Sequence, residues 1–184
     1  MPIRQIVMAA VAFLMLGSML AGAQRGKEQP SYIVYTDSSG SVVLTAPEAW
    51  VFDPRAVAFH PAGTQGESAP AIIYVKTVAK KGYPTLQSFI DSDVERAKTV
   101  SPGARVTAED PLPTARGTKA PVNHFSGLID GNVESHAYVE APSVYVKIVL
   151  SSNDEAAQKK AYAALSAVLK SYHFSTVTGG AIRK

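Results

Sequence analysis

Alternating hydrophobic and polar positions along the chain predict a series of β-strands, and two longer stretches repeat at helical spacing. Short runs of β-favouring residues bounded by turn residues indicate strands. We expect these strands at residues 32–35, 41–45, 71–79, 104–108, 119–128, 133–140 and 143–150. Apolar residues at helical spacing predict helices over about 85–99 and 154–172. Grouped strands with two amphipathic helices predict an α+β fold, in which an antiparallel β-sheet is sandwiched by α-helices.

The first predicted helix has one apolar and one charged face. The inner positions are Leu86, Phe89, Ile90, Val94, Ala97 and Val100, and the outer face is expected to carry Asp91, Asp93, Glu95, Arg96 and Lys98. Thr85 is expected to cap this helix, and Asn153 or Asp154 the second one. Residues 109–117, which include two prolines, are expected to form a loop.

Two turn signals assign faces to the C-terminal strands. We interpret Asp130-Gly131 and Ala141-Pro142 as two-residue hairpin loops. Side chains alternate across a strand, so one face becomes apolar and forms the core. That face carries Val122, Ala137, Val139, Val144, Val146 and Ile148. In this register Phe125 lies opposite His136, Tyr138 opposite Tyr145, and His136 opposite Lys147.

The other face of these strands carries a mixed polar and aromatic set, which gives the candidate site. Its members are Phe125, Glu134, His136, Tyr138, Tyr145 and Lys147. One interpretation is that the set packs under a helix with its polar tips at the rim. The other is a shallow binding surface for a planar or anionic ligand or a partner protein, formed by Phe125, His136, Tyr138, Tyr145 and Lys147.

The N-terminus is typical of a secretory signal. Arg4 supplies a positive charge, an apolar run of small and large residues follows, and Ala21-Gly22-Ala23 matches a cleavage signature. We therefore expect residues 1–23 to be a signal peptide and the mature chain to begin at Gln24, with no integral membrane span after cleavage. A retained N-terminal anchor is the alternative. An extracytoplasmic location, periplasmic or secreted, follows from the first interpretation.

Composition narrows the classes of function. The 184 residues contain no cysteine, which excludes a disulfide scaffold, a cysteine nucleophile and a thiolate metal site. The formal charge of +3 falls to +2 when Arg4 is removed with the signal, so nucleic acid is not an expected partner. We find no nucleophile elbow and no phosphate-binding glycine loop. His124 and His136 are expected on opposite faces, so neither a metal site nor a cofactor is predicted.

Four stretches of the chain resemble the PsbP-like superfamily, named for a photosystem II extrinsic subunit. They are the strand and turn from Val42 to Trp50, the helix opening at Thr85, the strand pair around Tyr138 and Tyr145, and the last helix running into Phe174. The resemblance covers roughly residues 32–174. It implies an antiparallel sheet between helical layers and a largely non-catalytic role. The expected signal peptide, with no plant-type transit sequence, fits the bacterial cell-envelope branch.

These observations give an ordered set of hypotheses. We expect a flexible lead-in at 24–31, a single domain at 32–174 and a disordered tail at 175–184. The leading hypothesis is a non-enzymatic accessory or binding module with an envelope protein partner or a small ligand. A small-ligand carrier that uses the Tyr138/Tyr145 face is one alternative. A hydrolase or lyase with a non-local site around His136 is the other.

Overall fold

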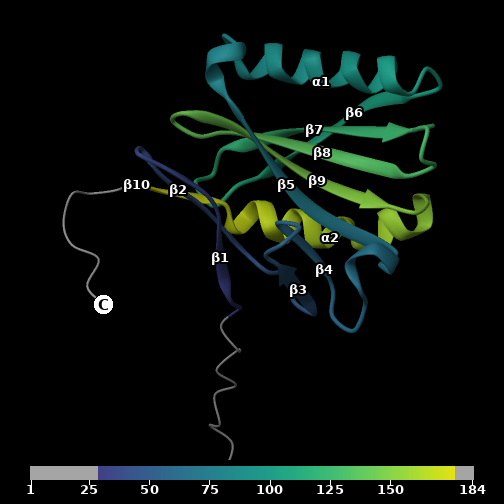
Figure 1. Ribbon diagram of the computed structural model, residues 1–184, viewed down its shortest axis with the longest axis horizontal. Coiled ribbons are helices and arrows are strands. Elements are labelled where there is room, and N and C mark those ends of the chain that lie inside the picture. Colours follow the sequence, from purple (N-terminus) through teal and green to yellow (C-terminus); the bar gives the residue numbers. More distant parts are fainter. Residues whose placement is uncertain (1–28, 177–184) are drawn as a thin grey trace, which may run out of the picture.

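A computed structural model describes residues 29–176, which form two sheets and two long helices (Figure 1). All strand pairs are antiparallel. In chain order the elements are β1 (Ser31–Asp37), β2 (Gly40–Thr45), β3 (Trp50–Asp53), β4 (Ala58–Pro61), η1 (Gly66–Ser68), β5 (Ala71–Ala79), η2 (Lys80–Gly82), α1 (Leu86–Val100), β6 (Arg105–Pro113), β7 (Lys119–Ser126), β8 (Val133–Glu140), β9 (Val144–Ser152), α2 (Glu155–Ser171) and β10 (His173–Thr176).

The large sheet separates the two helices. Its seven strands run in the order β3-β4-β5-β9-β8-β7-β6, and the small sheet has the order β1-β2-β10. Helix α1 covers one face of the large sheet, while α2 packs on the opposite face beside the small sheet (Figure 1). The predicted α+β fold, with an antiparallel sheet between helices, is therefore confirmed.

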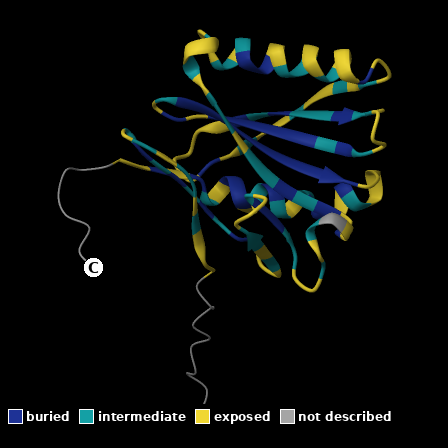
Figure 2. Ribbon diagram, viewed as in Figure 1, coloured by how far each residue is buried: buried dark blue, intermediate teal, exposed yellow. Residues whose placement is uncertain are grey.

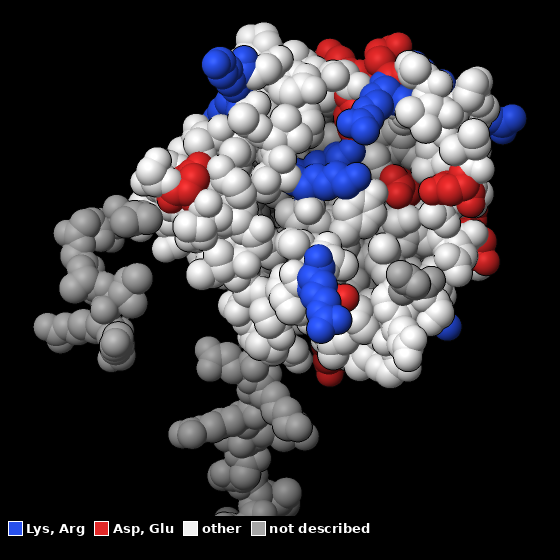
Figure 3. Space-filling model, viewed as in Figure 1, with Lys and Arg blue, Asp and Glu red and all other residues white. Residues whose placement is uncertain are grey.

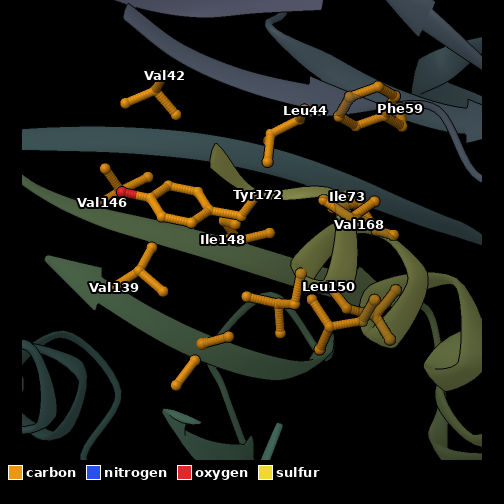
Figure 4. Close-up of a cluster of buried hydrophobic side chains, with 14 of the residues drawn as sticks. Val42, Leu44, Phe59, Ile73, Val139, Val146, Ile148, Leu150, Val168 and Tyr172 are labelled. Atoms are coloured by element: carbon orange, nitrogen blue, oxygen red, sulfur yellow. The ribbon is translucent and has the colours of Figure 1, made fainter. Parts of the chain in front are cut away.

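The main core lies between the large sheet and α2 (Figure 4). Ile148, Leu165 and Val168 are fully buried there, and Phe59 and Leu44 extend the core towards the small sheet. Each such side chain contributes roughly 1.5–3 kcal/mol through removal of apolar surface from water. The six residues predicted as the core face all belong to this cluster: Val122, Ala137, Val139, Val144, Val146 and Ile148.

The predicted pairing of the C-terminal strands is wrong by two residues. Phe125 pairs with Glu134 rather than His136, because the β7–β8 connection spans residues 127–132 instead of two residues. Tyr138 pairs with Lys147 rather than Tyr145, because Ala141 bonds to Val144 and the tight turn is shifted by one residue. A shift of two residues preserves the face of every side chain, so the two predicted faces remain correct.

Local sequence signals define both helices. Thr85 caps α1 by accepting a bond from the Ser88 N–H, and Ser88 completes a capping box. Asp154 caps α2 through the N–H of Ala157. The loop predicted at 109–117 is wrong in its first half, because β6 continues to Pro113. The register irregularity between Glu109 and Leu112 accommodates Pro111 on this edge strand, where its missing N–H leaves no pairing bond unmade.

The first and last strands lie close to the predicted ends of the domain. Ser31 begins β1, and the expected signal segment 1–23 lies outside the described residues. Ser175 and Thr176, which were expected in the tail, pair with β2 as the last residues of β10, and 177–184 lie outside the described part. Among the residues described, no helix has both the length and the hydropathy that crossing a membrane requires.

Candidate functional site

The five residues of the predicted binding surface lie together on the face of the large sheet that α1 covers. Phe125 comes from β7, His136 and Tyr138 from β8, and Tyr145 and Lys147 from β9. Their exposed fractions are 0%, 5%, 0%, 2% and 8%, in that order. Figure 2 shows the same strands as buried beneath a helix whose outer side is exposed. In this arrangement the set packs under a helix, but its polar tips are buried and bonded to carboxylates rather than placed at the rim of the helix.

Asp93 of α1 connects the helix to this face. Its Oδ2 atom lies 2.7 Å from His136 Nδ1 and accepts a 2.8 Å hydrogen bond from the Tyr138 hydroxyl. Its Oδ1 atom accepts a short hydrogen bond from Lys147 Nζ. Three donors from two neighbouring strands thus converge on one carboxylate.

Glu134 extends the cluster on the other side of the imidazole. Its Oε2 atom lies 2.6 Å from His136 Nε2, and its Oε1 atom accepts a 3.1 Å hydrogen bond from the Tyr74 hydroxyl of β5. Both ring nitrogens of His136 therefore lie within hydrogen-bond distance of a carboxylate oxygen. Two carboxylates, one imidazole and one ammonium thus form a buried cluster whose members are hydrogen-bonded to one another.

Burial and charge act against each other on the pKa values in this cluster. Burial raises the pKa of Asp93, but the hydrogen bond from His136 and the charge of Lys147 outweigh burial and hold that pKa below its usual range. The pKa of Glu134 is also lowered, because His136 outweighs the effect of burial. Burial lowers the pKa of Lys147 although Asp93 opposes it. Burial and the Asp93 charge both raise the pKa of Tyr138.

Aromatic rings enclose the ionic cluster. The Phe125 ring stacks on His136 with centroids 4.0 Å apart. Phe89 of α1 stacks on Tyr145 at 5.5 Å and meets Tyr138 edge-on at 5.9 Å. Because these rings exclude water, the polar contacts beside them are stronger than they would be on an open surface.

The prediction that Asp93 lies on the outer face of α1 is wrong. Its side chain is only 10% exposed and points to the sheet. The helical repeat indicates this inward position, because residue 93 lies four residues after Phe89 and therefore on the same side of the helix. Asp93 was nevertheless assigned to the outer face because it is charged, and carboxylates are seldom buried without a partner. Tyr74 was missed as well, because no local pattern in β5 indicates a partner on β8.

His124 lies on the opposite face of the sheet from His136, as expected. Its Nε2 atom is 3.2 Å from Glu155 of α2, and its Nδ1 atom is 3.8 Å from Glu109 of β6. The two carboxylates approach different ring nitrogens, so they do not share a position at which one ion could bind. Within residues 29–176, no group of three or more His, Asp or Glu side chains has the geometry of a metal site.

A groove of about 460 Å³ lies beside the buried cluster, between α1 and strands β6 and β7. Ile90 and Val94 provide apolar lining from the helix, Pro121 lines it from β7, and Glu95 and Asn123 add polar groups. Its volume is within the range of small-molecule sites. On the face seen in Figure 3, acidic side chains lie close to some of the basic ones, and uncharged surface interrupts the basic groups, which form no continuous stripe.

The comparisons with known proteins extend the description of the fold. The sequence matches no protein-family model and no curated protein. The structure of cyanobacterial PsbP (CyanoP) from Synechocystis sp. PCC 6803 matches with a TM-score of 0.51 and 13% identity, covering 85% of this chain and 99% of that one. The protein of unknown function PA94 from Pseudomonas aeruginosa matches with a TM-score of 0.51 and 15% identity, over 78% and 94% of the two chains.

These two similarities define the class of fold. The chain has a PsbP-like α+β fold, and the resemblance inferred from the sequence is confirmed at the level of the fold. Identities of 13% and 15% carry no functional residue from either structure to this chain.

Proposed function

We propose that this protein is a non-enzymatic accessory or binding module that acts outside the cytoplasm, in the periplasm or after secretion. The observation that carries the proposal is the closed state of the Asp93–Glu134–His136–Lys147 cluster. Its acids and bases are hydrogen-bonded to one another, and His136, the candidate base, is only 5% exposed. General acid–base catalysis needs such a group within reach of a substrate proton, and this burial does not favour that access.

Two further features support a role in binding. The groove between α1 and the β6–β7 strands is concave and combines an apolar lining with a few polar groups, as ligand sites commonly do. The N-terminal sequence, with Arg4 before an apolar run and Ala21-Gly22-Ala23 after it, favours export. A PsbP-like fold is compatible with this role, although a fold does not determine a function.

Export is tested by fractionating the native host and measuring the intact mass of the protein. We expect the protein in the periplasm or the medium, with Gln24 as its first residue. Protein that is found in the cytoplasm and still begins at Met1 would contradict the proposed location. Membrane-bound protein with an intact N-terminus would instead support a retained anchor.

The binding role is tested by native mass spectrometry of the protein isolated from the host envelope without denaturation. We expect a stoichiometric added mass, from either a partner chain or a small ligand, that is lost on acid denaturation. Catalytic turnover that disappears in His136→Asn and persists in the control His173→Asn would favour the hydrolase or lyase alternative. His173 is a suitable control because it is exposed and lies in β10, away from the cluster.

A further inference from the structure

The sheet face under α1 contains a built carboxylate site. His136 Nδ1, Tyr138 Oη and Lys147 Nζ all direct hydrogen bonds to the two oxygens of Asp93. All three donors are at least nine-tenths buried, and Glu134 fixes the imidazole from its other nitrogen. Donors held in this way are organised before any anion arrives, so little ordering is needed when a carboxylate binds.

Helix α1 supplies two chemical groups to this face, one turn apart. Asp93 supplies the carboxylate, and Phe89 supplies an aromatic ring that lies nearly parallel to Tyr145, at an interplanar angle of 10°. Residues four apart on a helix project from the same side. An aromatic ring with a carboxylate a few ångströms away is also the chemistry of a small aromatic acid.

The helix itself has few buried attachments. Phe89 and Ile90 are buried as whole residues, Asp93 adds a side chain that is only 10% exposed, and the rest of α1 is half-buried or exposed. Pro84 precedes it, and Pro102 and Gly103 follow it, so both connections contain residues that interrupt regular structure. Displacing α1 would therefore expose the Tyr138/Tyr145 face without disturbing the main core on the opposite side of the sheet.

We propose that the face formed by His136, Tyr138, Tyr145 and Lys147 is a binding site for a small aromatic carboxylic acid, and that α1 is its lid. Phe89 and Asp93 occupy the site in the closed state, and the ligand replaces them with its own ring and carboxylate. This inference rests on the proposed binding function and gives it a ligand class. Because α1 is tethered to the sheet, its groups compete at a high effective concentration and weaken the apparent affinity of the closed protein.

Removing the two α1 side chains that occupy the site tests the proposal. The double variant Phe89→Ala/Asp93→Ala removes both internal groups and keeps a good helix former at each position. The probe is 3-phenylpropionate, measured by isothermal titration calorimetry. We expect the double variant to bind it at least about tenfold more tightly than the unmodified chain does, because the tethered competitor is absent.

Matched controls separate this effect from general loosening of the helix. Arg96→Ala alters an exposed position of the same helix that does not line the groove, and is expected to leave the affinity unchanged. Adding Lys147→Met to the vacated variant is expected to weaken binding at least about tenfold, through loss of a charged donor. The neutral analogue 3-phenylpropanamide is expected to bind at least about tenfold more weakly than the acid for the same reason.

Two results would overturn the proposal: a folded double variant with no saturable binding, or equal affinity for the acid and the amide. If the double variant does not fold, Asp93→Ala is heated in sodium formate and in sodium chloride at equal ionic strength. We expect formate to raise the unfolding temperature by filling the vacated position, and equal temperatures would contradict the proposal. These experiments use defined probes, so a negative result would contradict only the site for an aromatic acid. A partner or ligand recovered with the protein from the envelope would still support the proposed binding module.

Discussion

Asp93 joins three side chains of the sheet to one carboxylate, and its removal should be costly. In Asp93→Ala, the Lys147 ammonium loses its carboxylate partner in a site where it is only 10% exposed. Breaking a buried ion pair from one side costs about 3–5 kcal/mol. We expect a loss of about 3 kcal/mol in the free energy of unfolding, measured by urea titration. The control Asp91→Ala, which removes one exposed contact to Gln87, should stay within about 0.5 kcal/mol.

The same carboxylates predict an acid-sensitive protein. The pKa values of Asp93 and Glu134 are lowered in the folded state: burial raises them, but the hydrogen bonds and nearby positive charges, from His136 for both groups and also from Lys147 for Asp93, together outweigh burial. The unfolded chain therefore binds more protons between the folded and unfolded pKa values, and acidification favours unfolding. This contribution is fully present above the unfolded pKa values of about 4 and is lost as the pH falls below them.

Urea midpoints measured between pH 3 and pH 6 test this pH dependence. The unmodified chain should lose stability steeply at the acid end of that range. Asp93→Asn lacks one of the two carboxyls whose pKa is lowered. Its stability should therefore decline less steeply as the pH falls. Parallel curves for the two proteins would mean that Asp93 does not contribute to the acid sensitivity.

At the scale of single elements, α1 depends on its N-terminal cap as well as on Asp93. The Thr85 hydroxyl accepts a 3.0 Å hydrogen bond from the Ser88 N–H, a group that would otherwise have no partner within the helix. Thr85→Ala should lower the free energy of unfolding by about 1 kcal/mol in urea titrations. Thr99→Ala, near the other end of the helix, removes only a bond to the Glu95 carbonyl and serves as the control. Equal losses in the two variants would contradict a specific role for the cap.

Elements whose signals are local could be predicted from the sequence. β5 and β8 have the expected bounds, and the caps of both helices are the expected residues. The faces of β7, β8 and β9 were also predictable, since alternation survives a shift of two residues. The exact pairing was not, because it depends on how many residues each connection contains. The continuation of β6 through Pro111 was missed because an edge strand tolerates proline.

The candidate site shows the same division between local and long-range information. His136, Tyr138, Tyr145 and Lys147 were placed on one face by alternation alone. Asp93 and Tyr74 join them only through packing of α1 and β5 against β8 and β9. Such contacts link residues 43 and 60 positions apart, for which a single sequence contains no periodic signal.

At the scale of the whole molecule, the C-terminal strand β10 joins the N-terminal strand β2 in the small sheet through a close approach at Gly40. Gly40 has φ +149°, and a β-carbon there would lie against the Ser175 carbonyl oxygen and 2.6 Å from the Phe174 ring. Gly40→Ala should therefore disrupt the pairing of β2 with β10 and cost at least about 2 kcal/mol in urea titrations, from backbone strain and overpacking together. Gly63→Ala provides the matched control, since Gly63 also has a positive φ, +82°, but faces open space. A Gly40→Ala variant no less stable than Gly63→Ala would contradict this view of the junction.

The closed ionic cluster under α1 is the feature on which this view of the protein depends, and histidine modification tests it most directly. The native protein is treated with diethyl pyrocarbonate, and peptides are analysed by mass spectrometry. The exposed His173 should be modified, whereas His136, 5% exposed with both ring nitrogens bonded, should react only after unfolding in urea. Modification of His136 in the folded protein at the rate of His173 would show an open, reactive imidazole and would contradict the closed cluster.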